Sequence, residues 1–198
     1  MKKEKPILFK TDMVQAIIAK KKVQTRRITE PLKYINKNPD DWELEDNNRF
    51  ANKKTGELMY DLTYEEGQHL WVKETWHIER YENIDGGEGD RLETLAYRAD
   101  GIDKPYWKPS LFMPKRYARL WLRVTAVKFQ RIQDISDYDI RKEGVDILLS
   151  GNYTEEDRRQ IRYAWIKLWD SINAKRGYPW KMNPWVSIIH FVMAEKKQ

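Results

Sequence analysis

The sequence predicts one α+β domain with a barrel-like arrangement of strands, on three observations. The chain has 198 residues, a length typical of a single domain and sufficient to bury a core. Aromatic residues make up 13% of it, including nine tryptophans and eleven tyrosines, which disordered chains lack. The expected elements are a strand, a helix, a strand, an insertion, several strands, two helices and a last strand. Because they do not alternate as β-α-β units, a doubly wound sheet is not expected.

The first expected elements are a strand, a helix and a second strand. Residues 6–9 predict the first strand. Thr11 or Asp12 is the expected N-cap of the helix, which ends in the lysines at 20–22, where cations favour the helix dipole. Residues 23–28 then predict a strand that begins with a β-branched residue but is very polar.

The middle of the chain predicts an insertion followed by short strands. Asn, Asp, Gly and Lys dominate residues 31–66, so we expect an acidic, irregular insertion, either a long loop or a small hairpin. Residues 69–76 predict a buried strand after a turn at Gly67. The stretch DGGEGD at 85–90 lacks the Gly-Lys-Ser/Thr ending of a phosphate loop, which indicates a plain turn. Residues 95–99 predict a short strand.

The C-terminal half predicts a long strand, two helices and a last strand. Residues 119–129 alternate as in a half-buried strand. Ser136 caps a short helix that Gly144 ends. A capping pair at 154–157 opens the strongest helix, which has one apolar stripe at helical spacing. The stripe consists of Ile161, Ala164, Trp165, Leu168 and Ile172. Residues 185–193 predict the final strand.

The composition excludes several classes of protein. The mean hydropathy is -0.86 and no apolar run approaches the roughly 20 residues that span a bilayer, so we expect no membrane association. The start, MKKEKP, is followed by no apolar region, so no signal peptide is expected. The absence of cysteine excludes disulfides, thiolate metal ligands and cysteine nucleophiles. Only three scattered histidines are present, so we expect no metal, and no organic cofactor is expected either. The lack of cysteine fits the cytoplasm. A monomer is assumed.

Charge is distributed unevenly along the chain, whose net charge is +6. Residues 1–37 have a balance of +8, residues 38–104 of -10, and residues 105–198 of +8. If the two cationic ends meet in the fold, they form a basic face suited to phosphate. The alternative is that the basic and acidic parts attract each other.

The segment KKKVQTRR at 20–27 is the first candidate site. Five of its eight residues are cationic, and crowding of like charges lowers the pKa of a lysine, which can then act as a base or nucleophile. Arg26 and Arg27 have guanidinium forks suited to phosphate oxygens, and Lys21 lies beside them. The same pattern also fits an ordinary solvated helix end and edge strand.

Glu143 is the second candidate, because a carboxylate in the last turn of a helix faces the negative end of the dipole. A lysine from elsewhere in the fold would compensate for this placement. The alternative is that Arg141, Lys142 and solvent suffice.

Two aromatic segments are further candidates for base binding. In LWVKETWH at 70–77, strand alternation places Glu74 and Trp76 on one face, where the indole would stack on a base and the carboxylate would accept from its amino group. The alternative is that the tryptophans are core and the charges end the strand. The segment GYPWKMNPW at 177–185, with Trp180, either walls a base pocket or packs over the helix stripe.

Seven segments between residues 6 and 193 together resemble one family. They are PILFKTDMVQAIIAKKKVQTRRI, GQHLWVKETW, YRADG, WKPSLFMPKRYARLWLRVTAV, IQDISDYDIRKEG, LWDSINAKRGYPW and NPWVSIIHF. This set resembles the ASCH domain family of the PUA-like superfamily, and more closely its phage-encoded branch, often labelled morphogenetic protein. The resemblance covers nearly all of the chain. It implies a small β-barrel with flanking helices, a cleft beside the first helix and, for a phage protein, location in the host cytoplasm.

The resemblance also implies a site. Small bacterial ASCH proteins include an amidohydrolase of N4-acetylcytidine that uses a lysine, a threonine and a glutamate. By position these are Lys22, Thr25 and Glu143 here, and the trailing arginine of the same motif is Arg27.

This chain departs from that motif at two positions. The glycine before the lysine is Lys20, which changes the turn after the helix. The threonine after the lysine is Val23, which removes a hydroxyl. The chain is also about twice as long as those minimal enzymes, and the acidic insertion accounts for part of the difference.

The leading hypothesis is therefore a hydrolase that removes an acyl group from a modified base or nucleoside. Thr25 would be the nucleophile, Lys22 the base, and Glu143 the group that holds the lysine and helps to activate water. Trp76 and the loop with Trp180 would stack the base. The alternatives are a non-catalytic module that binds RNA, DNA or a modified base, and a ribonuclease. In each case the partner is nucleic acid or a nucleoside.

Overall fold

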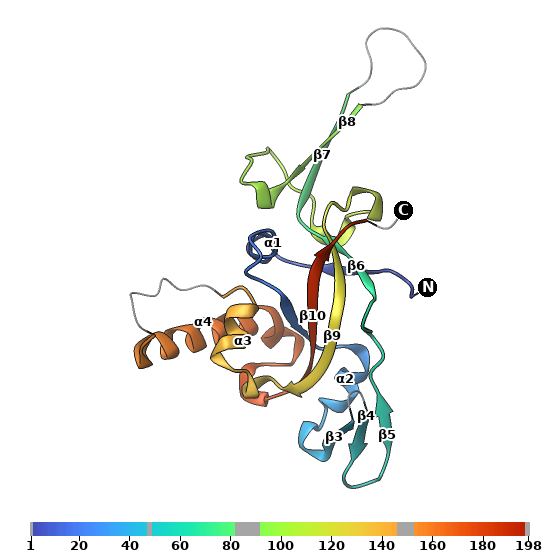
Figure 1. Ribbon diagram of the computed structural model, residues 1–198, viewed down its shortest axis with the longest axis vertical. Coiled ribbons are helices and arrows are strands. Elements are labelled where there is room, and N and C mark those ends of the chain that lie inside the picture. Colours follow the sequence, from blue (N-terminus) through green and yellow to red (C-terminus); the bar gives the residue numbers. More distant parts are fainter. Residues whose placement is uncertain (1, 47–48, 82–91, 146–152, 197–198) are drawn as a thin grey trace.

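The computed structural model describes residues 2–46, 49–81, 92–145 and 153–196. A five-stranded sheet runs through the middle of the molecule, with the strand order β1-β6-β9-β10-β2 (Figure 1). Its strands are β1 (Lys5–Leu8), β6 (His69–Lys73), β9 (Trp121–Arg131), β10 (Trp185–Ala194) and β2 (Gln24–Arg27). Strand β1 pairs with β6 in parallel, and the other pairs are antiparallel.

The predicted α+β class is confirmed, but the described strands do not close into the expected barrel. Strands β1 and β2 are the two edges of the sheet and do not pair with each other. Both are only four residues long, and helix α1 (Thr11–Ile18) connects them. Val14 and Ile17 of α1 are buried in the same core as the apolar residues of β6, β9 and β10. Helix α1 thus covers the sheet, and the sheet stays open because its edge strands, β1 and β2, are not paired with each other.

The turn after α1 differs from the prediction that the helix continues to Lys22. The helix ends at Ile18, and Lys10 rather than Thr11 or Asp12 is its N-cap. Lys20 has a φ of 58°, in the left-handed region. A side chain with a Cβ atom is disfavoured there, and glycine is the usual residue.

Because of this strain, we expect Lys20→Gly to raise the free energy of unfolding by about 0.5–1 kcal/mol. Urea denaturation measures the difference. Lys21→Gly is the control, since Lys21 has no positive φ and glycine there only adds flexibility to the unfolded chain. An equal or lower stability of Lys20→Gly would contradict the expectation.

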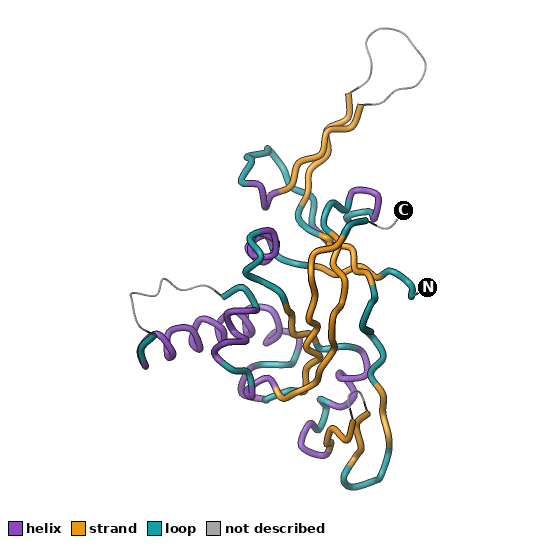
Figure 2. The backbone as a smooth tube through the Cα atoms, in the orientation of Figure 1, coloured by secondary structure: helices purple, strands orange, loops and turns teal. Residues whose placement is uncertain are grey.

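Helices α3 (Asp137–Lys142) and α4 (Glu155–Asn173) pack against each other beside the lower half of the central strands (Figure 2). Ser136 caps α3 as predicted, and its Oγ accepts a hydrogen bond from the Asp139 amide. Thr154 and Asp157 form the predicted capping box of α4. The buried stripe of α4 joins a second core with β10, in which Ile161, Trp165 and Trp169 are almost fully buried.

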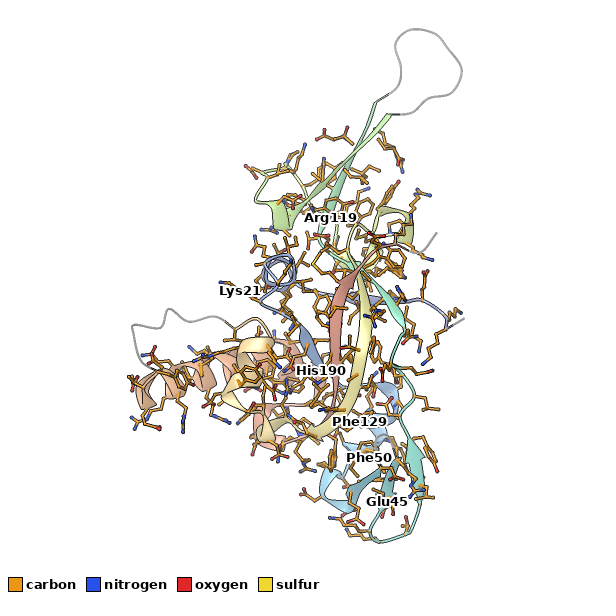
Figure 3. All side chains as sticks on the ribbon, viewed as in Figure 1. Lys21, Glu45, Phe50, Arg119, Phe129 and His190 are labelled. Atoms are coloured by element: carbon orange, nitrogen blue, oxygen red, sulfur yellow. The ribbon has the colours of Figure 1, made fainter. Side chains whose placement is uncertain are left out.

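The segment predicted as an irregular insertion is more regular than expected. It forms the short helix α2 (Glu30–Ile35) and a three-stranded antiparallel sheet. The strands of this sheet are β3 (Trp42–Asp46), β4 (Arg49–Asn52) and β5 (Leu58–Tyr60). Phe50 of β4 packs edge-on against Phe129 of β9, with ring centroids 5.4 Å apart (Figure 3). This long-range aromatic contact orders a segment whose own composition favours loops.

The strand predicted for 69–76 is interrupted, which changes the surroundings of two candidate residues. Strand β6 ends at Lys73, and Trp76 begins β7 (Trp76–Tyr81), which forms a hairpin with β8 (Leu92–Tyr97). This hairpin projects from one end of the molecule (Figure 1). Strand alternation therefore does not relate Glu74 to Trp76. The turn predicted at 85–90 lies outside the described residues.

Among the described residues, no helix combines the length and the apolar character that crossing a bilayer requires.

Candidate active site

A cleft of about 290 Å³ lies where β2, α2 and α4 meet. Thr25, Arg26 and Arg27 of β2 line it, together with Glu143 at the end of α3. An apolar wall comes from α4, in the residues Trp165, Leu168, Trp169 and Ile172. Arg176, Lys33 and Glu30 add charged groups. The volume is near the lower end for small-molecule pockets, and the lining combines an apolar wall with a few polar groups, as such pockets do.

A buried ion-pair cluster borders this cleft. The Lys22 Nζ donates to Oε2 and to the main-chain carbonyl of Glu143, at 2.8 Å each. The other carboxylate oxygen, Oε1, accepts from Arg26 at 2.8 Å. Lys22 is 2% exposed and Glu143 is 3% exposed. One carboxylate thus bridges two cations among buried side chains. Of the two alternatives for Glu143, the structure shows the lysine from elsewhere in the fold, Lys22.

The main chain brings these side chains together across 121 residues. Lys22 and Glu143 form a single β-bridge, and the Val23 amide donates to the carbonyl of Lys142 at 3.0 Å. Gly144 follows with a φ of 85°, and a Cβ atom there would lie 2.9 Å from the Cβ of Ala16. Glycine therefore lets the end of α3 approach α1 closely enough for Glu143 to reach Lys22.

Burial is the largest influence on Lys22 and lowers the pKa of its ammonium group. Glu143 opposes this effect through its charge and its hydrogen bond, while Arg27 and Arg26 lower the pKa further. The Glu143 carboxylate stabilises the charged form of Lys22, but it also binds Arg26, whose positive charge works against that form. The cluster therefore favours a lysine that can lose its proton more readily than a surface lysine.

We expect Arg26→Met to raise the pKa of Lys22, for two reasons. The substitution removes a neighbouring positive charge, and it leaves the Glu143 carboxylate to act on Lys22 alone. Titration of the Lys22 Nζ by ¹⁵N NMR, in the wild type and the variant, measures the shift. An unchanged or lower pKa in Arg26→Met would show that Arg26 does not tune this lysine.

Thr25 lies in the same cleft as Glu143 and Arg26 but is not part of their hydrogen-bond cluster. It is 4% exposed and pairs with Ile189 in the register of β2 and β10. Among the described residues, none makes a hydrogen bond with the Thr25 hydroxyl. Lys22 does not line the cleft, because its side chain is covered. The structure thus joins Lys22 to Glu143 directly and places Thr25 on the cleft side of the same segment.

The remaining candidate residues of the basic segment differ in their surroundings. Arg27 lines the cleft, donates to the carbonyl of Leu8 and lies over the Phe9 ring at 5.0 Å from its centroid. Burial lowers the pKa of its guanidinium, which begins high enough that the group stays charged. Lys21 is exposed at the turn after α1 (Figure 3).

Three predicted base-binding residues do not line the cleft. Glu74 is 1% exposed, and both of its carboxylate oxygens accept from Arg119, at 2.9 and 3.0 Å. Trp76 is buried at the base of the hairpin against Tyr117. Trp180 packs against the second core, and its amide donates to Asp170. The structure therefore gives Glu74 and Trp76 partners away from the cleft, whereas Trp180 packs on the core that contains Trp165 and Trp169, as the second alternative for its segment expected.

Several residues of the cleft were not predicted as functional. Trp165, Leu168 and Ile172 were predicted only as an apolar helix stripe, and the pattern does not reveal that one end of the stripe forms a wall. Tyr64 also lines the cleft, and burial raises the pKa of its hydroxyl while the nearby Arg27 lowers it. It comes from the insertion, where the composition gave no signal of a site.

The chain is similar in structure to an ASCH domain from Lactobacillus crispatus JV V101, known from a high-resolution crystal structure. The similarity covers 96% of this chain and 79% of that one, with 12% identical residues and a TM-score of 0.43. No model of a protein family matches the chain, and no curated protein matches its sequence. The similar structure is thus an ASCH domain, from the family that the sequence resembles. At this identity and TM-score, the chemistry of the site must be derived from this chain's own residues.

Proposed function

We propose that this protein is an ASCH-like, nucleic-acid-related hydrolase that removes an acyl group from the exocyclic amino nitrogen of a modified base. The observation that supports this function is the buried Lys22–Glu143 pair beside a cleft that Thr25 lines. A lysine whose pKa is lowered by burial is suited to take a proton from a hydroxyl group. The chemistry resembles that of other nucleophiles activated by an adjacent base.

In the first proposed step, the Thr25 hydroxyl oxygen attacks the carbonyl carbon of the acyl group. Neutral Lys22 takes the hydroxyl proton. The bond between the carbonyl carbon and the base nitrogen then breaks, and the Lys22 ammonium returns the proton to this nitrogen as it leaves. The products of the step are the free amino base and an ester on Thr25. The Lys22 Nζ, which donates to Glu143, would have to turn toward the Thr25 hydroxyl for this step.

In the second proposed step, water attacks the ester carbon and Lys22 takes one of its protons. The ester bond breaks, and the proton returns to the Thr25 oxygen. Glu143 holds the lysine and stabilises the ammonium form that Lys22 takes between the two proton transfers of each step. The balance is one amide and one water consumed, and one amine and one carboxylic acid formed.

The cleft also contains groups suited to the rest of a nucleoside or nucleotide. The wall of Trp165 and Trp169 is apolar and limits the access of water to the reacting atoms. Arg27 and Arg176 present guanidinium groups suited to phosphate or to a ribose hydroxyl. We propose a nucleic acid or a modified nucleoside as the partner, with no metal involved.

A non-catalytic module that binds a modified base is the second candidate. The observation that favours it is the burial of Lys22, which does not line the cleft and makes two hydrogen bonds to Glu143. Such a pair could also be purely structural, with Arg26 and Thr25 binding a ligand that is never changed.

Incubation of the protein with N4-acetylcytidine and a panel of other N-acylated nucleosides, followed by mass spectrometry, separates these candidates. The hydrolase is expected to release the free nucleoside and the carboxylic acid. Thr25→Val, which removes the hydroxyl and keeps the shape, should release neither. If no member of the panel loses its acyl group with the wild type, whether it is offered free or within a short single strand, the hydrolase is wrong and the binding module is favoured.

A further inference from the structure

Two further hollows adjoin the cleft. The first, which we call the tyrosine hollow, has a volume of about 430 Å³ and shares Lys33 and Arg176 with the cleft. The second, which we call the Lys10 hollow, has a volume of about 320 Å³ and shares Arg27 with it. Because the two hollows share different residues with the cleft, each adjoins a different part of its lining, and we call the three together the track.

The lining of both hollows is cationic. Lys33, Lys37 and Arg176 line the tyrosine hollow, and no carboxylate is among its described lining residues, although Lys33 is paired with Glu30 of the cleft at 2.5 Å. Lys10 and Arg27 line the Lys10 hollow, again with no carboxylate in its described lining. The acidic groups of the track, Glu30 and Glu143, lie in the cleft between them. Positive charge on both sides of a pocket attracts a ligand with a phosphate on each side of the group that is bound.

The tyrosine hollow also offers aromatic surface. Tyr34 is 43% exposed, although its ring contacts Trp42 edge-on. Lys37 Nζ lies 5.4 Å from the centroid of the Tyr34 ring. Tyr178 lines the same hollow. An exposed aromatic ring next to a cation is the arrangement on which proteins stack the bases of single-stranded nucleic acids.

The Lys10 hollow has polar groups of another kind. Thr11, Thr75 and Ser110 line it with hydroxyl groups, and Lys10 Nζ lies 3.3 Å from the Ser171 hydroxyl. Hydroxyl and ammonium donors are typical contacts of phosphate and sugar oxygens. This side of the track is therefore suited to the backbone rather than to a base.

We propose that the substrate of the site is a single-stranded oligonucleotide, and that free nucleosides are poor substrates. The acylated base enters the cleft, a neighbouring nucleotide stacks in the tyrosine hollow, and the backbone on the other side follows the Lys10 hollow. This inference rests on the proposed function for its reaction, while its binding part stands on the charges and aromatic groups of the two hollows. Duplexes do not fit, because their bases are paired and stacked.

The first test compares kcat/KM for N4-acetylcytidine, free and in the middle of a pentanucleotide, with ribose and deoxyribose backbones. At least a fivefold preference for one pentanucleotide is expected, since a stacked base adds about 1–3 kcal/mol of binding. Equal kcat/KM for the free nucleoside and both pentanucleotides would agree with the proposed hydrolase activity and would contradict the proposal that a single strand binds along the track.

The second test is independent of activity and measures binding of an unmodified, fluorescein-labelled pentanucleotide by anisotropy at several salt concentrations. Lys37→Glu and Lys10→Glu are each expected to weaken binding and to reduce the salt slope by about 0.7, the value for one phosphate contact of a single strand. Lys53→Glu is the matched control, because Lys53 is exposed in the turn between β4 and β5 and lines none of the three hollows.

The outcomes separate the two proposals. Binding that depends on Lys37 and Lys10, without hydrolysis of any substrate, supports the track and overturns the hydrolase. Unchanged binding in both variants, or tighter binding of the duplex than of the single strand, overturns the track.

Discussion

Lys22→Met is expected to abolish hydrolysis and to leave a folded protein. General base catalysis contributes about 10²–10⁴-fold, so kcat/KM should fall by at least that factor when the base is lost. Methionine has a similar length and no charge, so it fits a site that is 2% exposed. Glu143 keeps its hydrogen bond to Arg26 at 2.8 Å, so the buried carboxylate is not left without a cation.

The measurement is kcat/KM for acyl release together with a thermal unfolding curve. Lys53→Met is the control for loss of a lysine, because Lys53 is exposed and distant in the fold from β2. A folded Lys22→Met protein with the activity of the wild type would show that Lys22 is structural, and the assignment of the base would be wrong.

Glu143→Ala is expected to cost about 3–5 kcal/mol of folding free energy, because it leaves the buried Lys22 without its counter-charge and leaves Arg26 with only the longer contact to Asp139, at 3.6 Å. Lys22 and Arg26 both donate to this one carboxylate, and their side chains are 1% and 0% exposed. The truncation also removes the group that holds Lys22, so activity should be lost as well. Glu57→Ala, on the exposed surface beside β5, is the control and should change stability little.

The loss in Glu143→Ala should depend on pH in a defined direction. Without Glu143, the influences that remain on Lys22 all lower its pKa in the folded state below the ordinary value of 10.5. A lysine that binds its proton less tightly when folded destabilises the protein most at low pH. The stability of the variant should therefore rise with pH between the lowered pKa and 10.5, and urea denaturation across that range measures it. A penalty that does not change with pH would point to packing rather than charge.

Local signals in the sequence predicted the elements well where short-range chemistry decides them. Ser136 and the pair at 154–157 cap the helices as expected, because a cap depends on residues three positions apart. The need of Glu143 for a cation was also visible, because the helix dipole is a local effect. Its partner Lys22 was not deducible from spacing alone, since 121 residues separate them. The resemblance to a family motif supplied that pairing.

The predictions that were wrong concern residues whose surroundings are set by contacts with distant parts of the chain. Glu74 appeared available for a base because its partner, Arg119, lies 45 residues further along the chain. Trp76 appeared to share its strand, but the chain leaves β6 after Lys73 and starts a hairpin. The small sheet is stabilised by the packing of Phe50 against Phe129 of the central sheet. The polar composition of the segment that contains Phe50 does not indicate this contact. In each case tertiary packing overrides the local preference.

The most direct test of the central claim is to detect the ester on Thr25. The protein is mixed with N4-acetylcytidine, free and in the middle of a single-stranded pentanucleotide, quenched in acid at short times, digested and mapped by mass spectrometry. An acetyl group on the peptide that contains Thr25, present in the wild type and absent in Thr25→Val and Lys22→Met, is the predicted result. Acetate release without any acetylated peptide at Thr25, or with the modification on another residue, would contradict the role of Thr25 as nucleophile.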